Sequence, residues 1–333
     1  MRTPTYQPLV HRTAVATTVA ALLPIAVGAV VTTMKWGMAF RDWPTSDGRN
    51  MLAYPWLADF VRGAMDRFTE HGHRLAGMLI GVMCIGLTVV VWRREGRLWV
   101  RLLAAGVLLG VIVQGLLGGA RVLGDDPRMA MLHGNFAAIV FCLMATVSLV
   151  TSRRWLQARP ASGGRRPAVV DASSLGILKP LALCTMFAVY AQFILGGRLR
   201  HLGDMLHEHL AGAVLAGLMV LATAVAAYRS KDRWLGSAGG WMLLFLLLQV
   251  GLGAGAWITK FGLAATGYVA AHGSPTQMIV RSSHTVVGML LLMTSLMMSL
   301  RVLRVGAASR GTIARPVSTS AIAGALSTEG GAG

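Results

Sequence analysis

Eight long apolar runs constrain the fold of this chain more than any other feature. A helix that crosses a bilayer needs about 20 mostly apolar residues. Runs of that length cover roughly residues 13–34, 73–92, 98–120, 131–152, 178–198, 207–228, 237–259 and 283–303. The mean hydropathy of +0.61 and the 13% of charged residues are unusual for a soluble protein. We therefore predict an all-α, polytopic membrane protein with eight transmembrane helices.

The basic residues lie in alternate links between these runs. A formal net charge of +18 could indicate a nucleic-acid partner, but arginine and lysine precede the first run and follow the second, fourth, sixth and eighth. The acidic residues gather in the opposite links. Membrane proteins carry their positive links on the cytoplasmic side. We therefore expect a plasma-membrane protein with both termini in the cytoplasm and no nucleic-acid partner.

A short pattern recurs near the ends of the odd-numbered runs. It reads QGLLGG at 114–119, QFILGG at 192–197 and QVGLGA at 249–254, and the first run keeps only Gly28 and Ala29. A link and a run led by histidine follow each time. This internal repeat predicts two pseudo-symmetric four-helix bundles.

The repeat also predicts the limits of the parts. The N-terminal half spans 1–152 and contains a long outer loop at 35–70. A cytoplasmic linker at 153–177 leads to the C-terminal half at 178–304. A disordered cytoplasmic tail occupies 305–333.

The leading histidines are His73, His133, His209 and His284. Each has glycine or alanine four positions later, on the same helix face, where a flat ligand needs space. One such histidine alone is usually an interfacial hydrogen-bonding residue. Four in equivalent positions indicate function, and two facing histidines in a four-helix bundle suit the axial positions of a haem iron. His207 is an alternative to His209, because Ala211 lies four residues after it.

Four arginines are candidates for binding haem propionates. Arg74 adjoins His73, Arg281 lies one turn before His284, and Arg121 and Arg198 follow the Gly-Gly pairs. Each could instead anchor its helix at the membrane interface.

Glu70 distinguishes the first half from the second. It precedes His73 by three residues and shares its face if the helix begins a turn early; no acid has this place in the second half. A cap at the helix start is the alternative role. The aromatic residues of the loop at 35–70 could cover a flat ligand or rest at the membrane interface.

These features together resemble the haem A synthase family, membrane enzymes that convert haem O to haem A for cytochrome oxidase. The matching motifs are Gly-x-x-x-x-Asp-Trp-Pro at 37–44 and Glu-x-x-His-Arg at 70–74, with the four histidines and the eight runs. The resemblance implies that His73 and His133 lie near the iron of substrate haem O, and that His209 and His284 bind a cofactor haem b. It implies Glu70 as the catalytic acid.

The resemblance also implies partners and one departure. A haem O synthase, which is a farnesyltransferase, would act before this chain, and cytochrome oxidase or its assembly factors after it. Many members carry a cysteine directly after Asp-Trp-Pro-Leu, where this chain has Thr45 and Ser46. Its cysteines, Cys84, Cys142 and Cys184, all lie in apolar runs, so we expect no disulfide.

Two other functions fit parts of the sequence. A dihaem membrane cytochrome that carries electrons between quinol and a partner explains the four histidines, but neither the acid of one half nor the long loop. A transporter explains the repeats, but the ionisable residues lie near helix ends and not at the midplane.

Overall fold

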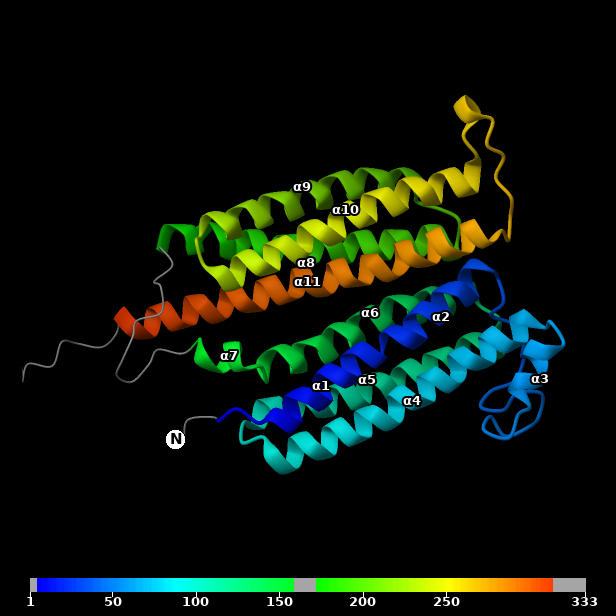
Figure 1. Cartoon of the computed structure of the whole chain (residues 1–333), viewed down its shortest axis with the longest axis horizontal. Coiled ribbons are helices and arrows are strands. Elements are labelled where there is room, and N and C mark those ends of the chain that lie inside the picture. The colour runs from blue at the N-terminus through cyan, green and yellow to red at the C-terminus, as the bar shows by residue number, and fades with distance from the viewer. Residues whose placement is uncertain (1–4, 159–171, 314–333) are drawn as a thin grey trace, which may run out of the picture.

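The computed structural model describes residues 5–158 and 172–313, in which long helices run side by side (Figure 1). Eight helical segments of this described part are long and apolar enough to cross a membrane. This confirms the predicted all-α membrane class. The elements are α1 (Pro8–Ala20), α2 (Leu22–Thr33), α3 (Trp56–Val61), α4 (Met65–Arg94), α5 (Leu98–Gly124), α6 (Pro127–Val150), α7 (Arg153–Gln157), α8 (Ala172–His201), α9 (Leu206–Arg229), α10 (Arg233–Phe261), η1 (Ala264–Thr266) and α11 (Pro275–Ile313).

The first span consists of two helices, α1 and α2, which meet at Ala21. Pro24 explains the break. It has no N–H to donate to the carbonyl of Ala20, four residues earlier, and its ring crowds that carbonyl.

The links alternate between two ends of the bundle. The loop at 34–64 with α3 and the link at 262–274 lie at one end, which we call the α3 end. The N-terminus and the last turns of α11 lie at the other (Figure 1). Helix α11 runs past the expected limit of 304 to Ile313. Residues 159–171 of the predicted linker and 314–333 of the predicted tail lie outside the described residues.

Apolar side chains on the outside of the bundle form stripes along the helices. On α5 four exposed leucines recur every seven residues, which is close to two helical turns. They are Leu102, Leu109, Leu116 and Leu123. An exposed apolar stripe of this length is suited to lipid and would be unfavourable in water.

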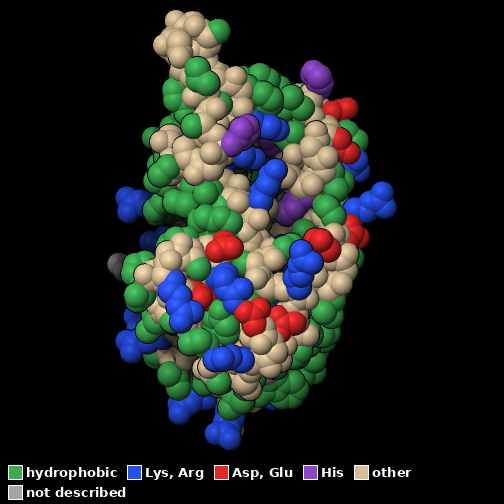
Figure 2. Space-filling model, turned by 90° about the vertical axis from the view of Figure 1, so that its right-hand side faces the viewer, with side chains coloured by type: hydrophobic (Ala, Val, Ile, Leu, Met, Phe, Trp, Pro, Cys, Tyr) green, Lys and Arg blue, Asp and Glu red, His purple; other side chains and the backbone are tan. Residues whose placement is uncertain are grey.

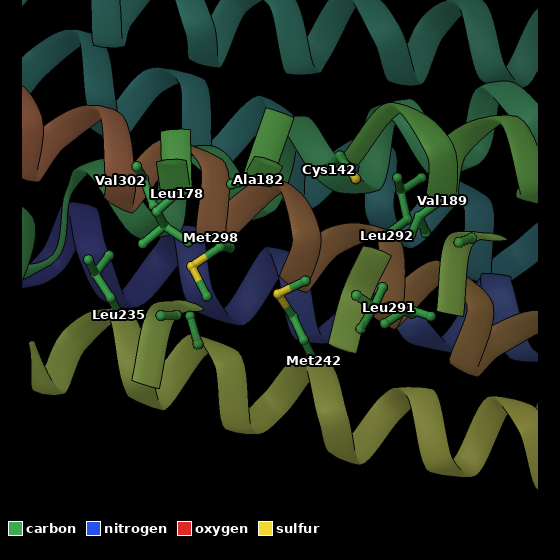
Figure 3. Close-up of a cluster of buried hydrophobic side chains, with 14 of the residues drawn as sticks. Cys142, Leu178, Ala182, Val189, Leu235, Met242, Leu291, Leu292, Met298 and Val302 are labelled. Carbon is green, nitrogen blue, oxygen red and sulfur yellow. The ribbon is translucent and has the colours of Figure 1, made fainter. Parts of the chain in front are cut away.

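Each half has its own apolar core. In the C-terminal half, Met242 of α10 packs near Leu291 and Met298 of α11 and Leu178 of α8 (Figure 3). A second cluster joins α1, α4, α5 and α6 in the N-terminal half. The halves contact each other through α2 and α6 on one side and α8 and α11 on the other. Residues near the α3 ends of these four helices therefore lie between the halves.

Candidate functional site

His73 of α4 and His133 of α6 face each other in the N-terminal half. Their ring centres lie 6.4 Å apart, and the ring planes are 82° to one another. Nδ1 of His73 lies 3.0 Å from the carbonyl oxygen of Pro24, and Nδ1 of His133 lies 3.1 Å from that of Gln114. A carbonyl oxygen only accepts, so Nδ1 is the donor in both rings. Nε2 is then unprotonated in both neutral rings and has a lone pair for a metal ion.

His209 of α9 and His284 of α11 repeat this arrangement in the C-terminal half. Their ring centres are also 6.4 Å apart, with an interplanar angle of 83°. The Gln192 amide lies 2.9 Å from Nδ1 of His209 and donates to its backbone carbonyl at 2.8 Å. Gln249 lies 3.4 Å from Nε2 of His284. His207 is exposed, so His209 is the histidine that faces His284.

A glycine on the preceding span makes room for each of these rings. A Cβ added at the glycine would lie 2.6 to 3.2 Å from Cε1 of the histidine, closer than a van der Waals contact. The pairs are Gly28 with His73, Gly118 with His133, Gly196 with His209 and Gly253 with His284.

The contacts explain the repeated sequence pattern. In three spans the residue four positions before the glycine is the glutamine that reaches the histidine, namely Gln114, Gln192 or Gln249. In the first span Pro24 has this position and contributes its carbonyl oxygen. One helix face thus carries both the polar partner of each histidine and the space for its ring.

The two ring pairs fit a haem held by two axial histidines. Imidazoles that bind one iron from opposite sides, with bonds of about 2 Å, have ring centres about 6 Å apart. Several buried polar atoms beside the rings have no hydrogen-bond partner in the described part of the chain: Oε1 of Gln114, Gln192 and Gln249, and Nδ1 of His284. No group of three or more His, Cys, Asp or Glu side chains in that part could hold a metal ion.

Glu70 is buried beside the first pair and holds the loop at 34–64. Its Oε2 accepts from the backbone N–H of Ala39 at 2.7 Å, and its Oε1 forms an ion pair with Arg74 at 2.8 Å. Helix α4 begins at Met65, so the early start is confirmed and the alternative role of Glu70 as a cap is wrong. The glutamate is more than a turn inside the helix.

Arg74 and Arg121 hold the other side of the same loop. Arg74 donates to the carbonyl oxygens of Asp42 at 2.8 Å and Thr45 at 2.9 Å. Arg121 of α5 donates to the carbonyl of Gly37 at 2.5 Å. The two sequence motifs at 37–44 and 70–74 are therefore one contact, in which the start of α4 binds the outer loop.

The loop also orders its own polar groups. Burial alone would raise the pKa of Asp42, but hydrogen bonds from Thr45 and from the backbone N–H groups of Gly48 and Asp47 lower it below its ordinary value. Burial and the hydrogen bond to Asp59 raise the pKa of Tyr54. Asp42 is thus anionic and Tyr54 neutral near neutral pH.

Comparison with known proteins gives consistent matches. A family model described as cytochrome oxidase assembly protein matches residues 64–210. A haem A synthase from Symbiobacterium thermophilum is 28% identical over 274 residues, which cover 72% of this chain and 82% of that protein. A haem A synthase from Bacillus licheniformis is 25% identical over 287 residues, which cover 77% of this chain and 87% of that protein. Over most of its length the chain is therefore similar to haem A synthases. No solved structure matches it.

Further haem A synthases match a shorter part of the chain. The protein from Geobacillus kaustophilus is 30% identical over 138 residues, which cover 40% of this chain and 41% of that protein.

The four arginines expected to bind haem propionates have different surroundings in this chain. Arg74 and Arg121 lie near enough to His73 for electrostatic interaction with its ring, although both also hold the loop. Arg198 is part-exposed and pairs with Asp204 at 2.5 Å. Arg281 is half-buried one turn before His284. Their binding of propionates stays a prediction.

Arg200 is a part-buried cation that the sequence interpretation missed. It donates to Ala29 O at 2.6 Å and to Thr33 Oγ1 at 2.8 Å, and it also contacts Thr285 Oγ1. No acidic side chain pairs with it in the described part of the chain. Its spacing in the sequence could have identified it. Gln192, Gly196 and Arg200 follow one another every four residues, so they share a helix face.

The α3 end that carries these sites is strongly polar. Viewed end-on, arginine, acidic and histidine side chains alternate over it, whereas the flanks of the bundle are mainly hydrophobic (Figure 2). The ring pairs thus lie below a charged surface that is continuous across both halves.

Proposed function

We propose that the chain is a haem A synthase, which oxidises one ring methyl of haem O to a formyl group by successive hydroxylations and so supplies haem A for cytochrome oxidase. Similarity to haem A synthases over most of the chain supports this activity. The observation that carries it is an asymmetry between the halves. Two similar histidine pairs are present, but among residues 5–158 and 172–313 only the pair of His73 and His133 has a buried carboxylate and a long loop beside it.

The two histidine pairs have separate roles in this proposal. His73 and His133 hold the substrate haem O, and His209 and His284 hold a resident haem b. Haem b supplies an iron centre that takes up and gives back single electrons. The glycine opposite each histidine and its polar partner fix the orientation of the ring, which sets the place of the bound macrocycle.

Glu70 is the proposed catalytic residue. Its carboxylate is removed from water, with a counter-charge on Arg74 at 2.8 Å. A carboxylate in such a site stabilises nearby positive charge strongly and can take up a proton from a neighbouring group. Because it also binds Ala39 N–H, the same group fastens the outer loop and excludes water from the first site.

The membrane orientation follows from the distribution of charge. The links at the N-terminal end carry many arginines, including Arg93, Arg94, Arg153 and Arg154. We therefore place this end in the cytoplasm and the α3 end on the outer side of the plasma membrane. A haem O synthase upstream and cytochrome oxidase or its assembly factors downstream are the proposed partners.

The test is to purify the full chain from cells that also make haem O, and to identify its extracted haems by chromatography and mass. We expect haem b together with haem A or its hydroxylated precursor. Haem b alone, with haem O available in the cells, would overturn the synthase assignment and favour an electron-transfer cytochrome. Cells without a haem O source are the matched control, because they should yield haem b without haem A.

A further inference from the structure

A pocket of about 370 Å³ lies beside the outer loop, on the side of α4 away from the first histidine pair. Its volume is within the range of small-molecule sites, which are mostly apolar with few polar groups. Aromatic and aliphatic side chains of the loop, of α3 and of α4 line it together with one histidine, His71. The lining includes Met51, Leu52, Tyr54, Trp56, Leu57 and Leu75.

His71 is fully buried and has one nitrogen without a partner. Its Nδ1 lies 3.1 Å from Oγ of Ser46, which is also fully buried. Its Nε2 has no hydrogen-bond partner in the described part of the chain. Leaving a buried polar atom without a hydrogen-bond partner has a cost in free energy. A ligand in the pocket that hydrogen-bonds to Nε2 would remove this cost.

The surroundings of the pocket indicate where such a ligand comes from. His71, Leu75 and Leu79 follow one another every four residues on α4, and Leu79 is exposed on the outside of the bundle. Leu57 and Val61 of α3 are also exposed, Val61 by 84%. An apolar surface on a membrane helix and on a short helix above it is suited to lipid and its interface. The pocket therefore adjoins the membrane.

We propose that this pocket binds the head group of a membrane hydroquinone, a lipid-soluble molecule with a phenolic ring and an apolar tail. The ring packs against Tyr54 and Trp56, and its hydroxyl hydrogen-bonds to Nε2 of His71. A phenolic hydroxyl both donates and accepts, so it satisfies Nε2 in either tautomer of the histidine. The tail extends along the exposed face of α4 into lipid.

Three alternatives fit the site less well. A lipid acyl chain fills the apolar volume but leaves Nε2 of His71 unsatisfied. A water-soluble anion has no cation at the pocket wall, because its lining includes neither lysine nor arginine. The prenyl tail of haem O would reach the pocket only around α4, since His71 and His73 lie about 200° apart on the helix.

The experiment titrates the purified full chain, in detergent micelles, with a short-tailed ubiquinol analogue while tryptophan fluorescence is recorded. We expect saturable quenching that is largely lost in Trp56→Phe. Ala58→Trp, which fills the pocket from α3 and leaves the His71 side chain in place, should abolish saturable binding. His71→Phe should weaken binding about tenfold, as expected for one hydrogen bond. Ser46→Ala is the matched control and should change binding by less than about threefold.

The outcomes separate this site from the haem chemistry. The titration needs no haem O, so it can succeed or fail independently of the synthase activity. Unchanged haem b content in each variant establishes that it folds. If His71→Phe does not retain haem b, the comparison of Ala58→Trp with the unmodified chain decides. Absence of saturable quenching in the unmodified chain, or equal affinity in Ala58→Trp, overturns the proposal.

Discussion

Gly28 of α2 lies directly against the ring of His73, and a Cβ at position 28 would stand 2.6 Å from Cε1. Gly253 lies against the ring of His284 in the same way, and a Cβ at position 253 would stand 3.2 Å from Cε1 of that histidine. Since these glycines lie on the neighbouring span of each histidine, the position of each ring depends on how two adjacent helices pack.

The glycines give a test that addresses each half separately. In Gly28→Val the larger side chain must displace His73, so we expect the first site to lose at least about tenfold in haem affinity, while haem b remains in the second. In Gly253→Val we expect the second site to lose haem b, while the first site keeps its haem affinity. Absorption spectra and extracted haem content of the two purified variants measure this. Loss of both haems in both variants would contradict two independent sites.

Glu70→Gln tests the carboxylate itself. The amide keeps the shape and can still accept from Ala39 N–H, but it has no charge to offer Arg74 or the substrate. We expect haem A yield to fall by about 10² to 10⁴, the usual contribution of a positioned acid or base, with haem O still bound.

Arg74→Gln separates catalysis from loop anchoring. It breaks the same ion pair and also the contacts with Asp42 and Thr45. Limited proteolysis of the loop at 34–64 should therefore be faster in Arg74→Gln than in Glu70→Gln. Full haem A yield from Glu70→Gln would refute a catalytic role.

Arg200 and Arg198 form a matched pair of substitutions on the last turn of α8. Arg200→Gln removes a part-buried cation near His284 that also donates to α2, so we expect about tenfold or greater loss of haem b from the second site. Arg198→Gln removes a part-exposed ion pair with Asp204, a type worth about 0–1 kcal/mol, so a clear loss of haem b in this variant would indicate that Arg198 also binds a propionate as predicted. Haem retention during dilution measures both variants, and unchanged retention in Arg200→Gln would count against Arg200.

Acidification should weaken the link between α4 and α5. Burial alone would raise the pKa of Glu95, but hydrogen bonds and the charge of Arg97 outweigh it and lower the pKa below its ordinary 4.5. A carboxylate with a lowered folded-state pKa stabilises the fold above its unfolded-state pKa. This stabilisation is lost as pH falls through the lower, folded-state value.

Melting temperature should therefore drop when the pH falls below about 4.5. The loss should be smaller in Glu95→Gln, which at neutral pH should cost about 1–3 kcal/mol. An identical pH dependence in the variant and the unmodified chain would show that Glu95 is not the group responsible.

Thiol reagents should not affect the outer loop. Ser46 of the outer loop contacts Nδ1 of His71. The cysteines of the chain, Cys84, Cys142 and Cys184, are free and lie in helices. Haem A yield should be unchanged by a membrane-impermeant alkylating reagent, and strong inhibition would contradict this account.

Much of the architecture followed from local sequence. Apolar runs specify membrane helices because every backbone N–H and C=O must be satisfied within the segment. The Gln-x-x-x-Gly repeat and the leading histidines, such as His133, were also visible, because helical spacing determines which residues share a face. Even the kink near Pro24 is a local effect of its missing N–H.

The tertiary structure decided which side chains meet. Sequence spacing could not choose between His207 and His209, because the choice depends on which face of α9 packs toward α11. Sequence spacing placed Arg198 in the site and missed Arg200. Two positions along a helix turn the side chain by about 200°, so these two arginines lie on different faces of α8. Sequence spacing left Glu70 as a cap or a catalytic acid, because its partner, Ala39, belongs to a distant loop. Helix periodicity is local, whereas burial and pairing arise only when helices far apart in the chain pack together.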